Sequence, residues 1–322
     1  MLDRITTLMT SQTMLGELNQ QLNTLQHTQQ QLSSGKKINE PSDDPYGMGQ
    51  SLQLNGDLSE LTQYSSNVTD GTAWSQASTT GLSDMSNVVQ RVRELLVETA
   101  NGTNNAADLS GAAVEVDQLI DQVKQDANTQ YNGQYIFSGS SGTKLQPYQT
   151  GSGSSDSYQG GSGAVYRKIG PATQVQVDVD TSASTASAAG GISSLLGNGQ
   201  TTAGQPAGDG LLLNALRNIA DDMRSGNTAD LGGADLASLD NNFQALQQMQ
   251  AAVGTTQYSL QLASTRLQDL QLNDTQVLSD TQDADMASTE ISFSMQQTAY
   301  EAALKASASI VQESLVDFLG NG

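Results

Sequence analysis

Very few side chains of this chain could carry out catalysis. Its 322 residues include no Cys and a single His, His27, which excludes thiol nucleophiles, disulfides and thiolate metal sites. Ser33 and Lys36 have the S-x-x-K spacing of penicillin-binding acyl enzymes, but the companion S-D-N and K-T-G motifs do not occur. No set of nucleophile, base and orienting group can be assembled from what remains. The sequence therefore predicts a protein that is not an enzyme and has no catalytic residue.

The sequence also contains few residues that could bind a metal or a cofactor. Asp43 and Asp44 are adjacent acids, but they lack the spaced ligands of a calcium loop. We interpret them as capping residues before a helix that begins at Pro45. Asn101, Gly102 and Thr103 fit the N-glycosylation pattern, which we interpret as a turn. No glycine-rich phosphate motif occurs, so the sequence predicts neither a metal nor a cofactor.

The charge balance also excludes two classes of partner. The chain has 34 acidic and 13 basic residues and a net charge of −21. Nucleic acids and anionic membrane surfaces attract clustered Lys and Arg, so neither is an expected partner. The N-terminus has no apolar signal-peptide core, and no stretch approaches the roughly 18 apolar residues of a membrane-spanning helix. We therefore expect no cleaved signal and no membrane insertion.

The elements that could position partners are long helices at the two ends of the chain. Over the first 34 residues, leucines follow a heptad pattern, with Leu15 and Leu22 at position a and three others at position d. The rest of this surface is uncharged and polar, so the apolar stripe is narrow. His27 falls at position f, away from the stripe, and is predicted to be solvated. The leucines of this helix are Leu8, Leu15, Leu18, Leu22, Leu25 and Leu32.

The last helix is predicted over residues 286–319, so both terminal helices span about 51 Å at 1.5 Å per residue. Two narrow stripes of equal length are best buried against each other, although their small apolar area makes the pair marginal in isolation. We therefore expect neighbouring copies to supply the remaining contacts. The stripe of the last helix consists of Leu304, Ala308, Val311, Leu315 and Phe318.

Between these helices the hydrophobic pattern predicts two further regions. A second helical stripe runs from Leu54 to Leu96, a shorter helix covers about 107–131 and ends at Asn132-Gly133, and a third stripe runs from Leu236 to Leu278. Strands are expected at 135–137 and around Val175. The predicted fold class is mainly α, with long coiled-coil-like helices from both chain ends packed together and a small β-containing middle insert. The predicted domains are 1–44 plus 283–322 for assembly, 45–134 plus 211–282 as a helical bundle, and 135–210 as an outer insert.

Four sequence stretches carry a family resemblance. These are LSSGKKINEPSDDP at 32–45, VTDGTAWSQASTTGLSDMSNVVQ at 68–90, QRVRELLVETANGT at 90–103 and YNGQYIFSGS at 131–140. In this order they resemble the signature of bacterial flagellins, and the likeness extends over the C-terminal helices. The motif positions that match are Ser34, Gly35, Ile38, Asn39, Asp43, Asp44, Arg91, Arg93, Glu94, Asn101 and Gly102.

Within that family the chain is most similar to hook-associated members at the hook–filament junction. The Pro-containing NEPSDDP and the ending ESLVDFLG carry this likeness. The resemblance implies a secreted structural adaptor in the bacterial flagellum, needed for filament assembly and motility, that forms a ring of like subunits. It also implies contacts with a neighbouring hook-associated protein and flagellin, export in an unfolded state through the type III channel, and an export chaperone on the C-terminal helices. The alternative within the family is flagellin, the filament subunit itself.

Two interpretations of the stretch around Arg91 stay open. On a helix, Arg91, Arg93 and Glu94 lie at the edge of the apolar stripe and could form ion pairs with a neighbouring copy, which is the favoured interpretation. The resemblance also implies that this stretch corresponds to a patch read by an innate immune receptor in some flagellins. Trp74 lies one step off the second stripe, so we predict a packing role for it.

Overall fold

The computed structural model describes residues 2–101, 104–139, 146–148, 164–179, 192–196 and 210–320. For residues 2–8, 10–11, 193–194 and 309–320 it describes the backbone alone. Much of the predicted insert, including the Gly/Ser-rich stretch 149–163, lies outside the described residues, as does Gly102.

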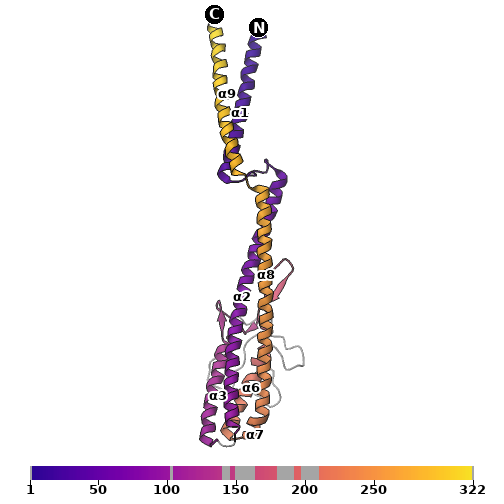
Figure 1. The fold of residues 1–322 in the computed structure, drawn as a ribbon, viewed down its shortest axis with the longest axis vertical. Coiled ribbons are helices and arrows are strands. Elements are labelled where there is room, and N and C mark those ends of the chain that lie inside the picture. The colour runs from indigo at the N-terminus through magenta and orange to yellow at the C-terminus, as the bar shows by residue number, and fades with distance from the viewer. Residues whose placement is uncertain are drawn as a thin grey trace. The chain divides into compact units, whose positions relative to one another are not determined.

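Helices account for most of the described chain (Figure 1). Long helices from both chain ends pack together, and the middle of the chain contributes two small antiparallel sheets, β1–β2 and β3–β4. The predicted mainly α fold class is confirmed. In chain order the elements are α1 (Leu2–Ser34), α2 (Pro45–Thr99), α3 (Ala106–Ala127), β1 (Gln130–Tyr131), β2 (Gln134–Tyr135), β3 (Tyr166–Lys168), β4 (Gln174–Gln176), α5 (Ile192–Leu196), α6 (Leu211–Ser225), α7 (Thr228–Asp230), the π-helix Leu231–Asp235, α8 (Leu236–Gln282) and α9 (Met286–Gly320).

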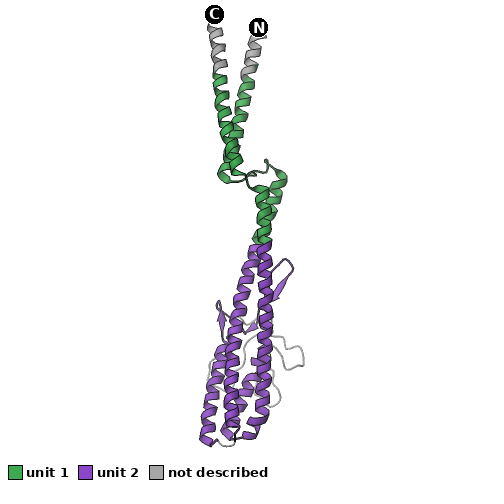
Figure 2. Cartoon of the chain, viewed as in Figure 1, with its two compact units in different colours: residues 1–60, 270–322 green, residues 61–269 purple. Residues whose placement is uncertain are grey.

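The chain divides into two compact units (Figure 2). Unit 1 comprises residues 1–60 and 270–322, and unit 2 comprises residues 61–269. Residues 135–210, the predicted insert, fall within unit 2. The three-domain division expected from the sequence stays a prediction.

Unit 1 is organised around the antiparallel pair of terminal helices. α1 and α9 lie side by side (Figure 1), as the matching lengths of their stripes predicted. α1 ends at Ser34, and α9 begins at Met286, close to Gly35. At Gly35 the chain turns into the loop that leads to α2. Gly35 has φ +71°, a left-handed conformation that favours glycine after a helix.

Unit 2 has a conventional hydrophobic core. Along α2, residues spaced three and four apart point inward, among them Leu82, Met85 and Leu96, each at 0% exposure. Facing residues from α3, α6 and α8 complete this core, including Val116, Leu216 and Leu246. Trp74 is 1% exposed and packs in the same cluster, in agreement with the predicted packing role.

Small residues on α2 make room for the middle segment of the chain. A Cβ on Gly71 would lie 3.1 Å from Cγ1 of Val177, just beyond β4, and a Cβ on Gly81 would lie 2.8 Å from the ring of Phe137. Arg167 of β3 fixes the β3–β4 hairpin to α2, since its Nε donates to Oδ2 of Asp70 at 2.6 Å. Gly71 and Gly81, which are weak helix formers, thus mark the close approach of a neighbouring segment, and α2 continues through both positions.

The region after α3 corrects two predictions. α3 ends at Ala127, not near Tyr131, because a short hairpin begins at Gln130. Asn132 and Gly133, expected to end the helix, form the two-residue hairpin turn, with φ of 50° and 74°. The strand expected at 135–137 is shorter and earlier, since β2 covers Gln134–Tyr135.

Candidate functional site

The contact between the terminal helices is a mixture of apolar and polar side chains. Leu18, Leu25 and Leu32 of α1 are half-buried, and Thr28 is 5% exposed. The Thr28 hydroxyl lies 2.8 Å from Oε1 of Gln296 on α9. This polar contact favours one relative position of the two helices, because sliding either helix would separate the two side chains. The Thr28 hydroxyl also lies 3.0 Å from the Thr24 carbonyl within α1.

On α9 the residues that face α1 lie one step away from the predicted stripe. Gln296, Tyr300 and Ala303 are half-buried, whereas Leu304 is 43% exposed and Ala308 is exposed. The side chains of Val311, Leu315 and Phe318, and that of Leu8 on α1, lie outside the described residues. The role of the predicted α9 stripe in assembly therefore stays a prediction.

Apolar side chains remain exposed on the outer faces of this helix pair. Leu15 of α1 is 58% exposed, although it fits the heptad, and Leu22 is half-buried. On α9, Ile291 and Met295 are 61% and 68% exposed at a spacing of four, which places them on one face of the helix. A single chain therefore leaves apolar surface on both terminal helices.

Backbone hydrogen bonds join the two chain segments of unit 1, at residues 35–37 and 282–284. Lys36 pairs with Asp283 in an isolated antiparallel bridge. The Lys37 amide donates to the Gln282 carbonyl at 2.7 Å, and the Ala284 amide donates to the Gly35 carbonyl at 2.9 Å. The segment before α9 is thus hydrogen-bonded to the segment after α1, which fixes where α9 begins relative to the end of α1.

Asp43 organises the loop between α1 and α2. Its Oδ2 accepts the amides of Asn39 and Glu40 at 2.9 and 3.0 Å, and its Oδ1 lies 2.9 Å from Nε2 of His27. The hydrogen bonds from Glu40, Asn39 and His27 lower the pKa of Asp43 to about 2, since all of them favour the ionised form. His27 is exposed, as predicted. It is not a bystander, however, because the loop folds back and brings Asp43 to the His27 side of α1.

The start of α2 depends on Asp44, Ile38 and Gly47. Oδ1 of Asp44 accepts the Tyr46 amide at 3.1 Å, which caps the helix that begins at Pro45. Ile38 is 3% exposed, and a Cβ on Gly47 would lie 2.6 Å from its Cδ1. A larger residue at position 47 would therefore displace the side chains of Ile38 and Asp44, a close approach that no spacing rule in the sequence indicated.

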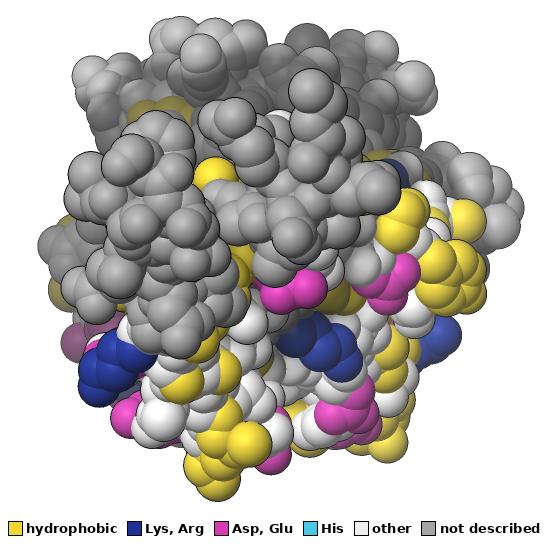
Figure 3. All heavy atoms as spheres, turned by 90° about the horizontal axis from the view of Figure 1, so that it is seen from above, with side chains coloured by type: hydrophobic (Ala, Val, Ile, Leu, Met, Phe, Trp, Pro, Cys, Tyr) yellow, Lys and Arg dark blue, Asp and Glu magenta, His cyan; other side chains and the backbone are white. Residues whose placement is uncertain are grey.

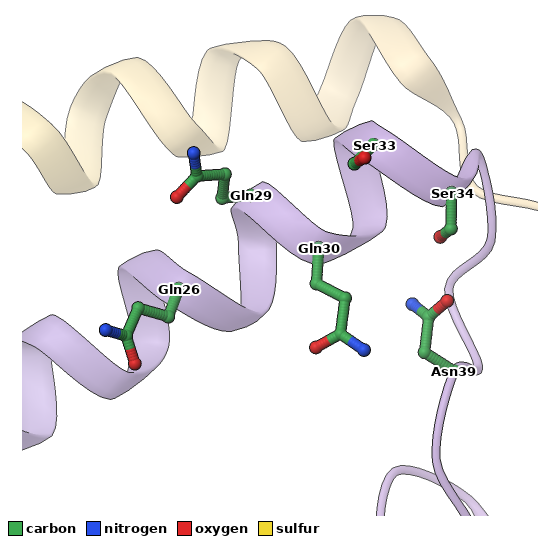
Figure 4. A pocket seen from close by; sticks show the side chains of 6 residues that line it. All are labelled: Gln26, Gln29, Gln30, Ser33, Ser34 and Asn39. Atoms are coloured by element: carbon green, nitrogen blue, oxygen red, sulfur yellow. The ribbon is translucent and has the colours of Figure 1, made fainter.

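The remaining motif positions at this loop support its backbone. Oγ of Ser34 accepts the Lys36 amide at 3.1 Å, and Nδ2 of Asn39 donates to the Lys36 carbonyl at 2.9 Å. A shallow hollow of about 420 Å³ lies beside them (Figure 4), lined by Gln26, Gln29, Gln30, Ser33, Ser34 and Asn39. Its lining side chains are polar and uncharged, and they offer no nucleophile–base pair.

The arginines of α2 are paired within the chain. Nε of Arg91 donates to Oε1 of Glu115 on α3 at 2.7 Å, and its Nη1 donates to Glu94 at 3.1 Å. Nε of Arg93 donates to Oδ1 of Asp240 on α8 at 2.8 Å. These side chains link neighbouring helices of unit 2, so any ion pair with another copy would have to replace or share an internal one. Asn101, after the end of α2, donates to the Val97 carbonyl at 3.1 Å.

The face of the molecule drawn in Figure 3 shows no basic patch among its described residues. On the face in Figure 3, Lys and Arg side chains are separated by acidic, apolar and uncharged ones. Within the described ranges, no group of three His, Cys, Asp or Glu residues could hold a metal ion. Among the same residues, no helix is both long and apolar enough to cross a bilayer.

Sequence reasoning missed Thr28, Gln296 and Gly47. Thr28 lies three residues after Leu25 and four before Leu32, so the same three–four count could have included it. Gln296 carried no signal, because its role depends on which face of α9 meets α1.

Residues 5–142 match the family model described as the bacterial flagellin N-terminal helical region. Phase 1 flagellin of Salmonella naestved is 35% identical over 130 residues, which are 40% of this chain and 26% of that protein. The chain thus matches about a quarter of the length of the curated relatives.

Solved structures extend the likeness over more of the chain. A Vibrio parahaemolyticus protein assigned as flagellar hook-associated has a TM-score of 0.62 at 20% identity, covering 75% of this chain and 100% of that one. The Legionella pneumophila flagellar hook associated protein-3 gives a TM-score of 0.57 at 15% identity, with coverage of 71% and 98%. Bacillus cereus FlgL gives a TM-score of 0.55 at 19% identity, with coverage of 70% and 99%. These matches show a shared fold.

Proposed function

We propose that this chain, which belongs to the bacterial flagellin family, is a structural adaptor that joins hook to filament at the hook–filament junction of the bacterial flagellum. In this role it is secreted and is needed for filament assembly and motility. The observation that carries the proposal is the extent of the fold match: the chain covers 98–100% of three structures whose names place them among hook-associated proteins or FlgL. The sequence alignment with curated flagellins, which is a separate measure, spans 26% of their length.

The exposed apolar residues of unit 1 support a role in assembly. Leu15, Ile291 and Met295 are more than half exposed on the terminal helices, and a contact with another subunit would remove them from water. A ring of like subunits, with a neighbouring hook-associated protein on one side and flagellin on the other, would supply such contacts. Nothing in this role requires catalysis, and the polar hollow beside α1 has no catalytic set.

Export in an unfolded state is part of the proposal. The chain has no Cys, so no disulfide has to be reduced before passage through a narrow channel. The terminal helices bury little apolar surface when alone, which makes them easy to keep unfolded. An export chaperone on the C-terminal helices would cover Ile291 and Met295 before assembly.

A strain that lacks the gene tests the junction role directly. We expect hooks without filaments and flagellin released into the medium, both visible by electron microscopy and immunoblotting. Normal filaments on the deletion strain would contradict the proposal. Flagellin is the second candidate, because the sequence matches are to flagellins; it predicts that the purified protein alone polymerises into long fibres.

Substitutions in the terminal helices test how the subunit assembles. Leu22→Asp and Leu315→Asp each place a charge in an apolar stripe, and we expect neither variant to restore filaments to the deletion strain. Leu262→Asp is the matched control, since Leu262 is 54% exposed in unit 2 and the change should leave filaments in place. Full motility with Leu22→Asp would count against assembly through the paired helices.

A further inference from the structure

Asp235, the last residue of the π-helix, occupies a position that an apolar side chain would normally fill. Leu231 and Leu239, four residues before and after it, are both at 0% exposure. Asp235 itself is 7% exposed, and its buried Oδ2 has no hydrogen-bond partner. An ionised carboxylate in this position would be strongly unfavourable.

The charged groups that act on Asp235 are all acidic. Asp222 of α6 and Asp230 of α7 both act on it electrostatically, and Asp222 lies within hydrogen-bonding reach of the protonated form of Asp235. Nδ2 of Asn227 holds these two neighbours together, lying 3.4 Å from Oδ1 of Asp222 and hydrogen-bonding to Oδ2 of Asp230. Among the described ion pairs, the nearby Arg224 pairs with Asp117 and Asp221 instead.

Burial and the two acidic neighbours raise the pKa of Asp235 to about 7. Burial is the largest cause, followed by the charge and the hydrogen bond of Asp222, and then by the charge of Asp230. A protonated Asp235 would be neutral and could donate its O–H to the Asp222 carboxylate. Such a hydrogen bond between an acid and a carboxylate is short and strong.

We propose that Asp235 and Asp222 share one proton that fastens the turn between α6 and α8, and that the turn loosens when this proton leaves. On deprotonation the O–H bond of Asp235 breaks and the proton passes to water. Three carboxylates then face one another around Asn227 with no proton between them. The glycine pair in the π-helix, Gly232 and Gly233, gives this turn the backbone freedom to open.

The direction of the pH dependence follows from the two protonation equilibria. Between pH 3.8, the ordinary pKa of Asp, and about pH 7, the raised pKa of Asp235, the closed turn holds a proton that the open turn does not. The closed state therefore weakens as pH rises through this window, by up to about tenfold in the opening equilibrium per pH unit. Above about 7 both states are deprotonated, and the dependence levels off.

Hydrogen exchange on the full chain between pH 5 and 8 tests the proposal. After correction for intrinsic exchange rates, we expect the opening equilibrium constant at the amides of 231–236 to increase by up to about tenfold per pH unit. The increase should continue to pH 7 and then level off. Asp235→Asn should remove this dependence, because its amide can still donate to Asp222 without titrating. Asp221→Asn, a neighbouring acid paired with Arg224, should keep it.

Two results would overturn the proposal. The first is opening at 231–236 that does not change with pH in the unsubstituted chain, and the second is an unchanged dependence in Asp235→Asn. If Asp235→Asn does not fold, the carboxyl ¹³C shift of Asp235 in the unsubstituted chain decides: a midpoint near 4 contradicts the shared proton.

Discussion

Units 1 and 2 use their apolar residues in opposite ways. Unit 2 buries a continuous cluster contributed by α2, α3, α6 and α8, whereas Ile38 is the one buried apolar side chain among those described in unit 1. Unit 1 leaves many of its large apolar side chains in water. Those that are exposed are Met9, Leu15, Tyr46, Leu52, Leu270, Leu272, Met286, Ile291, Met295 and Leu304.

This difference indicates how stability is divided in the molecule. A two-helix pair with a narrow, partly polar contact buries too little area to offset the entropy lost on ordering. Unit 2 packs several helices around one core and can be stable without a partner. Unit 1 is therefore the part whose order should depend on contacts with other subunits, in keeping with the proposed assembly role.

Leucine truncations should separate the two units most clearly. Leu82→Ala, at 0% exposure in unit 2, is expected to lower the free energy of unfolding by about 2–5 kcal/mol through lost contacts and a cavity. Leu15→Ala, at 58% exposure in unit 1, should change it by less than about 0.5 kcal/mol. Urea unfolding followed by the fluorescence of Trp74, the single Trp of the chain, measures unit 2. Equal losses for the two variants would break the comparison.

Glycine substitutions sharpen the same contrast. Gly81→Ala would place a Cβ 2.8 Å from the Phe137 ring, and we expect a loss of about 1–3 kcal/mol from overpacking in unit 2. Gly16→Ala meets no atom within 4 Å on α1 and should raise the helicity of unit 1, because alanine is favoured over glycine by about 1 kcal/mol in a helix. Circular dichroism of the monomers distinguishes these outcomes. A stabilising effect of Gly81→Ala would show that Phe137 does not pack tightly on α2.

The loop of unit 1 should show a smaller effect, a stabilising contribution of Asp43 that the unsubstituted chain loses only in acid. Because the pKa of Asp43 is lowered to about 2, its stabilising contribution is present above the ordinary value of 3.8 and is lost as pH falls through about 2. Asp43→Asn should lower the free energy of unfolding by about 1–2 kcal/mol at neutral pH. This is less than the energy that corresponds to the whole pKa shift, because the amide oxygen of Asn still accepts hydrogen bonds.

Amide shifts of Asn39 and Glu40, followed from pH 5 to pH 1.5, measure this contribution. In the unsubstituted chain they should titrate with a midpoint near 2, and in Asp43→Asn they should not. Glu17→Gln, an exposed position on α1, serves as the control and should leave the midpoint in place. A midpoint near 4 would mean that Asp43 does not bind the loop amides in solution.

The sequence predicted the helices well and their contact faces less well. The spacing of apolar residues located α1 and α9, because periodicity reports which side of a helix is apolar, and the equal lengths of their stripes indicated that they pair. The spacing did not indicate that Thr28 and Gln296 would meet, or that Leu15 would stay exposed, since many positions on these polar helices are nearly equivalent. The hairpin at Asn132-Gly133 carried its usual signal, which was outweighed by the helical pattern before it.

What the sequence determined by itself is local: helix periodicity, the glycine after α1 and the cap before α2. Each of these depends on residues within a few positions of one another. Tertiary structure decided the contacts between distant residues: His27 with Asp43, Gly81 with Phe137, and a buried Asp235 among two other acids. Such contacts depend on how whole helices are placed, and no spacing in a single segment records that placement.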